Sequence, residues 1–110
     1  MSCDTTLRNQ TDFNRIYQKG RSKVSRFVVI IYRKNGRPYS RTAFVASKKV
    51  GNSVERNRSR RVMREAVRLL GRELAPGYDV IFVARNQLLG HKTEEVRRSL
   101  YGTLKGIGLL

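Results

Sequence analysis

Side chains that could act as nucleophiles, general bases or metal ligands are scarce in this chain. Cys3 is its only cysteine and His91 its only histidine. A structural zinc ion needs several thiolate or imidazole ligands, so such a site is excluded, and no internal disulfide can form. We expect Cys3 to be a disordered terminal thiol rather than a nucleophile. His91 follows Gly90 in a polar turn, so a loop or capping role is expected rather than catalysis.

The acidic residues are too few and too scattered for a metal-dependent nuclease. Such an enzyme gathers carboxylates around one or two Mg²⁺ ions, whereas the eight acids here form no DxD or ExxH pattern. Four of them lie at the starts of predicted helices, where the helix dipole accounts for them: Asp12, Glu55, Glu94 and Glu95. The sequence therefore predicts that this polypeptide does not cleave phosphodiester bonds alone and binds no metal or other cofactor by itself.

Positive charge dominates the composition. The chain has 24 Lys and Arg residues against 8 Asp and Glu, a formal net charge of +16. In a compact domain these like charges repel one another and destabilise the fold, so we expect them to serve a binding partner. A polyanionic partner is the usual reason, with nucleic acid the first candidate and a membrane surface the second. No apolar run approaches the roughly 18 residues of a membrane span. The N-terminus also lacks the apolar stretch of a signal peptide, so a cytoplasmic location is expected.

Much of this charge falls in one predicted helix, from Val54 to about Leu70. Asn52 followed by Glu55 resembles a capping box that would start it. On a wheel of about 100° per residue, six polar side chains share an arc of roughly 140°. They are Arg56, Asn57, Arg60, Arg61, Arg64 and Arg68, with Arg58 near one border. The opposite, buried stripe is expected to hold Val62, Met63, Ala66, Leu69 and Leu70.

The spacing within that arc distinguishes it from an ordinary solvated helix face. Such a face mixes signs at i, i+4, because like charges there repel. Here arginines repeat every four residues from Arg56 to Arg68, and we expect Glu55 and Glu65 to lie off this ladder without neutralising it. The arginine guanidinium forms two parallel hydrogen bonds to a phosphate and stacks on exposed bases. Both contacts are suited to folded RNA. Asn57 would read a 2′-hydroxyl or base edge, or fix its arginine neighbours.

A second surface is an aromatic one. Phe13 and Tyr17 of a predicted helix, together with one face of strand 27–32, would form a platform for unpaired bases. The competing interpretation is that Phe and Tyr at helical spacing serve the core. The residues by themselves leave both interpretations open.

The remaining elements follow from periodicity and turn residues. We expect a helix over 11–20, strands over 27–32 and 42–47, an optional strand near 23–25, a central strand over 78–85 and a last helix opened by Thr93. Asn35-Gly36 and Pro38 predict that strands 27–32 and 42–47 form an antiparallel hairpin. With no repeat or linker, this is a single domain, 1–110, with an ordered core of about 7–104. Its class is α+β, with helices packed on one small sheet.

In this order the residues resemble the family of bacterial ribonuclease P protein components. The strongest match is SKKVGNSVERNRSRRVMREAVR, residues 47–68, which is similar to the family's RNR helix and the strand end before it. Supporting matches are Asp12-Phe13, Ile16-Tyr17 and Gly20, the FVVIIY strand, and DVIFVAR at 79–85. Together they cover about residues 7–104.

The resemblance implies an α/β sandwich of the ribosomal S5 domain 2-like type, with a small mixed sheet, three helices and a left-handed βαβ crossover. It implies two RNA partners, the catalytic RNA of ribonuclease P and precursor tRNA, with the Mg²⁺ of the holoenzyme held mainly by RNA. The protein would act as a monomer within the ribonucleoprotein. The 5′ leader cleft would involve Phe13 and Tyr17. The RNA-binding set would be Lys48, Lys49, Arg56, Asn57, Arg58, Arg60, Arg61, Arg64 and Arg68.

Three other interpretations remain beside this one. A basic ribosomal or ribosome-assembly protein shares the size and charge, and would be distinguished by the RNA it binds in cells. A protein that is itself a nuclease would cleave precursor tRNA without RNA. A DNA-binding helix module would prefer duplex DNA over precursor tRNA in competition.

Overall fold

The computed structural model describes residues 5–6, 10–71 and 74–110, so the expectation for Cys3 lies outside the described residues. The strands are β1 (Thr5–Thr6), β2 (Arg21–Val24), β3 (Val28–Lys34), β4 (Arg41–Val45) and β5 (Tyr78–Ala84). The helices are α1 (Gln10–Lys19), α2 (Ser53–Arg68) and α3 (Thr93–Gly106), with a 3-10 turn at Asn86–Leu88. The helices and strands predicted from periodicity are confirmed, including the optional strand, which is β2.

The apolar segment 78–85 forms the central strand. The sheet order is β1-β4-β5-β3-β2, and β5 runs antiparallel to β3 and parallel to β4. The predicted hairpin of β3 with β4 is therefore wrong, because β5 lies between them. Asn35 does turn the chain, since its side-chain oxygen accepts a hydrogen bond from Arg37 N at 2.8 Å. Its own backbone N–H donates to Gly77 O, which precedes β5, at 2.8 Å.

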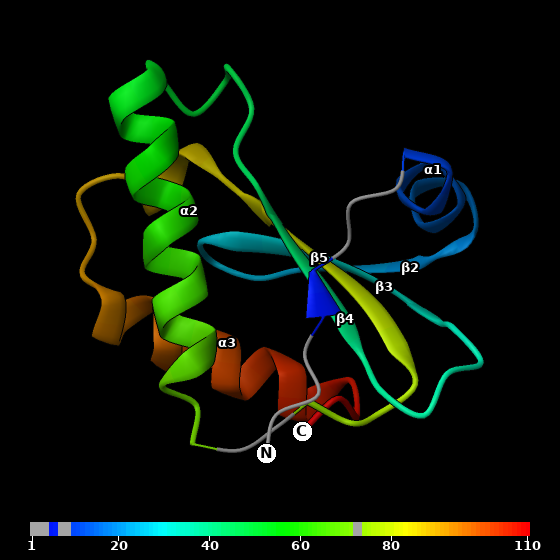
Figure 1. Cartoon of the computed structure of the whole chain (residues 1–110). Helices are drawn as coiled ribbons and strands as arrows, with labels where there is room; N and C mark the ends of the chain where they lie inside the picture. The colour runs from blue at the N-terminus through cyan, green and yellow to red at the C-terminus, as the bar shows by residue number, and fades with distance from the viewer. Residues whose placement is uncertain (1–4, 7–9, 72–73) are drawn as a thin grey trace.

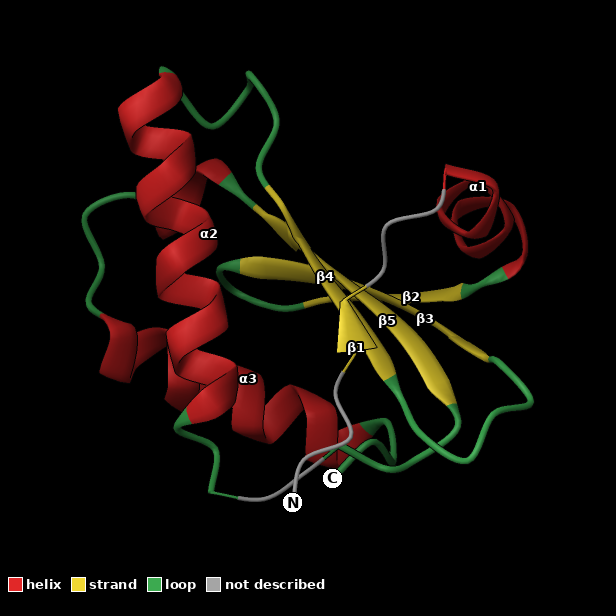
Figure 2. Cartoon of the chain, in the orientation of Figure 1, coloured by secondary structure: helices red, strands yellow, loops and turns green. Residues whose placement is uncertain are grey.

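Helices α2 and α3 cover one face of the sheet and enclose the main core with it (Figures 1 and 2). Helix α2 connects the parallel neighbours β4 and β5. Its buried side chains include Val62, Met63 and Ala66, so the opposite side of the helix is left to solvent. Leu69, expected in the buried stripe, is 44% exposed because the helix has ended at Arg68. The packed chain continues past residue 104, since Leu109 is fully buried.

Helix α1 lies against the other face of the sheet, where it covers only part of the surface (Figure 1). Its buried residue Ile16 packs with Ala43 and Ile81 in a small second core. Gly20 allows the close approach at the end of the helix. A Cβ atom there would lie 2.4 Å from the carbonyl oxygen of Ile16 and 3.0 Å from that of Tyr32.

The start of α2 is fixed by local chemistry, as predicted. Asn52 Oδ1 accepts a hydrogen bond from the backbone N–H of Glu55, and the Glu55 carboxylate accepts one from the backbone N–H of Asn52, both at 2.9 Å. This reciprocal capping box satisfies two backbone donors that the first helical turn leaves free. None of the described helices combines the length and the apolar character needed to cross a lipid bilayer.

Candidate nucleic-acid interface

The packing of α2 turns its arginines outward. Because the buried stripe of the helix faces the sheet and α3, the predicted polar arc faces solvent. Arg61, Arg64 and Arg68 are exposed, whereas Arg56 and Arg60 are half-buried. The structure thus brings the six predicted polar residues of the arc onto one surface, which we call the arginine face: Arg56, Asn57, Arg60, Arg61, Arg64 and Arg68.

Short contacts with polar and aromatic neighbours orient several of these side chains. Arg60 donates from Nη2 to Oδ1 of Asn57, so the expectation that Asn57 fixes an arginine neighbour is confirmed. Arg56 Nη2 donates to Ser53 Oγ at 3.3 Å. The guanidinium carbon of Arg64 lies 5.5 Å from the ring centroid of Phe44 on β4, a cation–π arrangement. None of these contacts neutralises charge.

The sequence predicts that Glu65 neutralises none of the arginines that repeat from Arg56 to Arg68. This prediction is wrong for Arg68. Arg68 donates from Nε to Glu65 Oε2 at 3.0 Å and from Nη2 to Oε1. These hydrogen bonds lower the pKa of Glu65 and raise that of Arg68. The two residues are three apart on the helix, and the long arginine side chain reaches back across one turn. Within the described residues, the other arginines of the face have no ion pair.

Arg58 points away from the arginine face. Its Nη2 donates to the carbonyl oxygen of His91 at 3.2 Å, which ties α2 to the loop before α3. The Nδ1 atom of His91 lies 3.2 Å from Glu95 Oε2, and the centroid of the His91 ring lies 4.5 Å from that of the Phe27 ring. The predicted loop role of His91 is confirmed. Arg58 has a structural contact of its own, and its contact with RNA stays a prediction.

A cleft of about 500 Å³ lies between the turn after β4 and the end of β5. Lys49 lines it from the turn after β4, and both Lys48 and Lys49 are exposed. Sequence reasoning missed Arg85, which also lines the cleft and donates from Nη1 to the carbonyl oxygen of Ser25 at 2.9 Å. The position of Arg85 at the end of a buried strand was the available signal. Val83 also lines the cleft, which therefore opens onto the face of the sheet that carries α1.

Phe13 and Tyr17 lie side by side on α1. Their ring centroids are 6.5 Å apart and their planes differ by 25°. Phe13 is half-buried against the second core, whereas Tyr17 is 48% exposed. Partial burial raises the pKa of the Tyr17 hydroxyl above its ordinary value. One ring therefore supports the core and the other faces solvent, and the platform for unpaired bases stays a prediction. Next to them, Val45 and Val83 leave the sheet surface half-exposed.

Two acids that looked unrelated in the sequence meet at one arginine. Arg41 donates to both carboxylate oxygens of Asp79, at 2.8 and 2.6 Å, and to Asp12 Oδ2 at 3.2 Å. The position of Asp12 is therefore explained by its ion pair with Arg41 as well as by the helix dipole. Asp79, which looked isolated in the sequence, is paired with the same arginine. In the described part of the chain, no three His, Cys, Asp or Glu side chains are grouped closely enough to hold a metal ion.

Comparison with known proteins gives one consistent result. The family model described as Ribonuclease P matches residues 1–108. The ribonuclease P protein component of Caldanaerobacter subterraneus is 39% identical over 101 residues, which are 92% of this chain and 87% of that protein. That of Alkaliphilus oremlandii is 36% identical over 110 residues, covering 100% of this chain and 96% of the relative.

The fold agrees with solved structures of the same family. The Staphylococcus aureus RNase P protein matches with a TM-score of 0.82 and 30% identity, covering 94% of this chain and 95% of that one. The Thermotoga maritima RNase P protein matches with a TM-score of 0.81 and 31% identity, covering 92% and 96%. The resemblance and the α+β class predicted from the sequence are both confirmed, and this chain belongs to the ribonuclease P protein family.

Proposed function

We propose that this chain binds the catalytic RNA of ribonuclease P through its arginine face and promotes endonucleolytic removal of the 5′ leader from precursor tRNA. The uncompensated charge of that face carries the proposal. Arg56, Arg60 and Arg64 repeat along one side of α2 without an ion pair to the described residues. Their mutual repulsion is relieved when RNA phosphates bind and release condensed counterions.

The 5′ leader is the second RNA segment in this proposal. Its unpaired bases would stack near Tyr17, cross the half-exposed sheet surface at Val45 and Val83, and reach the cleft between Lys49 and Arg85. Aromatic side chains favour base stacking, and basic side chains hold the backbone phosphates, so the path suits single-stranded RNA of any sequence. This path would run along the side of the sheet that carries α1, from α1 to the turn before α2, and Figure 2 shows where these elements lie.

Catalysis belongs to the RNA in this proposal, and Mg²⁺ is held mainly by RNA. The protein contributes position and charge, because its basic side chains screen the repulsion between two RNA molecules and raise substrate affinity. One copy would act within each ribonucleoprotein, in the cytoplasm where precursor tRNA is made.

Reconstitution tests the proposal. The protein is added to a bacterial ribonuclease P RNA at low Mg²⁺, and cleavage is followed for precursor tRNAs with leaders of about two and about ten nucleotides. We expect the protein to accelerate cleavage, and to improve substrate affinity more for the longer leader because only that leader spans the proposed path. Tyr17→Ala should reduce the advantage of the long leader.

One control accompanies this experiment. The protein without RNA should leave both substrates intact, and cleavage by the protein alone would contradict the assignment of catalysis to the RNA. Equal stimulation of both substrates would contradict the leader path while leaving the arginine face in place. No stimulation of either substrate by the folded protein would overturn the proposal as a whole.

A further inference from the structure

A second basic surface lies at the outer edge of β3, away from the arginine face. Strand β2 begins at Arg21, which pairs with Tyr32, so the last two residues of β3 have a strand neighbour only on the β5 side. A cleft of about 500 Å³ opens at this edge. Its lining comes from α1, β2, β3, β5 and the end of α3, and none of the lining residues belongs to α2.

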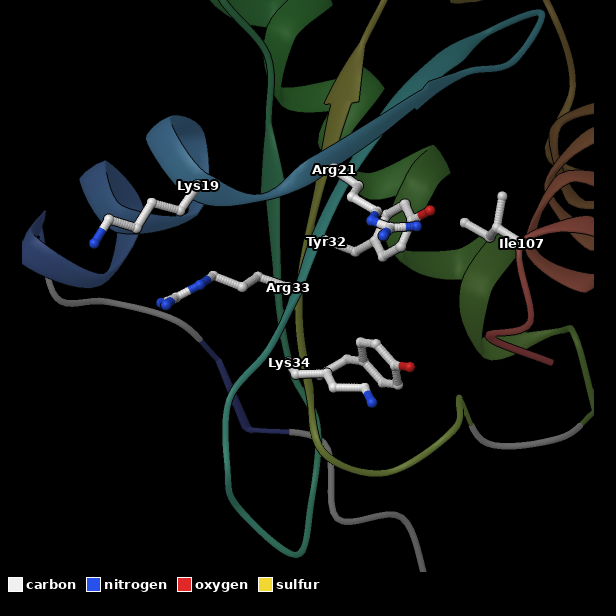
Figure 3. A pocket seen from close by; sticks show the side chains of 7 residues that line it. Lys19, Arg21, Tyr32, Arg33, Lys34 and Ile107 are labelled. Atoms are coloured by element: carbon white, nitrogen blue, oxygen red, sulfur yellow. The ribbon is translucent and has the colours of Figure 1, made fainter.

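The charged side chains that line this cleft are all basic. Figure 3 shows Arg21 and Lys34 extending to the side of β3 that carries Tyr32, while Lys19 and Arg33 extend to the opposite side. In the described part of the chain none of the four has an ion pair. Arg21 and Lys34 share one side of the strand without an ion pair to any described residue, so their charges repel each other and the fold gives no internal reason for them. The cleft is therefore suited to an anion.

Aromatic rings form the apolar part of the same cleft. The ring centroids of Tyr32 and Tyr78 are 6.5 Å apart, with their planes inclined by 57°. Both rings are half-buried, and Ile107 closes the cleft beside Tyr32 (Figure 3). Lys34 pairs directly with Tyr78 across the sheet, which places a cation next to a ring. Cations beside partly exposed aromatic rings match the phosphates and bases of a single RNA strand.

We propose that this cleft is a second RNA-binding site, which we call the β3-edge site. A single-stranded segment would place its phosphates at Arg21 and Lys34 and an unpaired base against Tyr32 and Tyr78. An acidic peptide would satisfy the cations but leave the rings without a stacking partner, so the aromatic residues favour RNA. The site goes beyond the function proposed above, because neither the arginine face nor the leader path includes it.

Binding of fluorescein-labelled decauridylate, measured by anisotropy at low salt, tests the site. The measurements use the Arg60→Ala/Arg64→Ala protein, in which the arginine face is weakened. Adding Arg21→Ala/Lys34→Ala should weaken binding about five- to tenfold, and the slope of log affinity against log salt should fall by about 0.7 for each phosphate that is no longer bound. Adding Lys92→Ala/Arg98→Ala instead removes the same charge from exposed positions outside the cleft. Equal affinities for these two variants would overturn the proposal.

A nuclear magnetic resonance titration of the wild-type protein does not depend on the folding of any variant. Amide signals of Tyr32, Lys34 and Tyr78 should shift and saturate with decauridylate. Sodium phosphate and oligoglutamate, at equal charge concentration, should shift them much less. Equal shifts with all three would show a general anion site and overturn the RNA assignment. Since reconstitution with ribonuclease P RNA is measured separately, failure here leaves the proposed function standing.

Discussion

The guanidinium of Arg41 on β4 donates a hydrogen bond to the carboxylate of Asp12 on α1, at 3.2 Å. Of the ion pairs among the described residues, this one alone joins α1 to the sheet. The helix that presents Phe13 and Tyr17 is therefore held by Ile16 in the second core, by the close approach at Gly20 and by this ion pair. The position of the aromatic pair relative to the sheet depends on these contacts.

Substituting the two partners should give different results. Arg41→Ala leaves the Asp79 side chain, 8% exposed, without its cation, and should lower the free energy of unfolding by about 3 kcal/mol. Asp12→Asn keeps the bonds between Arg41 and Asp79, and should cost about 0.5–1 kcal/mol. Urea unfolding measures both. Amide exchange in Asp12→Asn should accelerate in α1 and remain unchanged in β5, and uniform acceleration would argue against a local tether.

Gly20→Ala should destabilise the domain by about 1–3 kcal/mol. The added Cβ would lie 2.4 Å from a backbone oxygen of Ile16, which cannot move without displacing α1. Gly102→Ala is the matched control, because Gly102 is exposed in α3 with open space around it. Alanine in a helix interior is more favourable than glycine by about 0.5–1 kcal/mol, so this variant should be more stable. Thermal unfolding compares the two variants. Equal midpoints would contradict the close contact expected between the added Cβ at position 20 and the Ile16 carbonyl oxygen.

Arg60→Ala/Arg64→Ala should weaken binding of ribonuclease P RNA by about 3 kcal/mol in total at low salt. The slope of log affinity against log salt should fall by about 0.9 for each phosphate that the variant no longer binds. Arg98→Ala is the control, since Arg98 lies on α3 outside the arginine face. Its side chain is 77% exposed, and its ion pair with Glu94 is long, at 3.9 Å. Filter binding at several salt concentrations provides both quantities. Wild-type affinity in a folded double variant would refute the assignment of this face.

Glu65→Gln should strengthen RNA binding about two- to threefold at low salt, because it releases Arg68 and removes a negative charge that lies beside the arginine face. Glu94→Gln is a closely matched control. Glu94 accepts two hydrogen bonds from Arg97, at 2.8 and 2.6 Å, in the same i, i+3 arrangement but on α3. Both variants change the net charge equally, so a gain seen with both would indicate total charge rather than the arginine face.

Acid should weaken the fold through exposed carboxylates of α2 and α3. Hydrogen bonds from Arg68 lower the pKa of Glu65, and hydrogen bonds from Arg97 lower that of Glu94, below the ordinary value of 4.5. A lowered folded-state pKa stabilises the protein above the unfolded value, and this contribution disappears as pH falls through the folded-state pKa. Urea midpoints should therefore drop below about pH 4.5. The drop should be smaller in Glu65→Gln/Glu94→Gln, and an identical drop would exclude these two groups as its cause.

The sequence by itself determined the features that depend on neighbours along the chain. The capping box of Asn52 and Glu55 fixed where α2 begins, and the apolar stripe fixed which side of the helix turns inward. The arginine face follows from those two facts. The central position of β5 was also predictable, because a nearly continuous apolar run is typical of a central strand covered on at least one face.

Only the tertiary structure decided which distant segments meet. Turn residues near Asn35 specify a reversal of the chain, but they do not specify that β5 enters between β3 and β4, because strand pairing depends on burial across the whole sheet. The meeting of Asp12 with Asp79 at Arg41 follows from that strand order. The β3-edge site likewise depends on where β2 begins opposite Tyr32. Each of these contacts joins residues far apart in the sequence, so no local pattern encodes it.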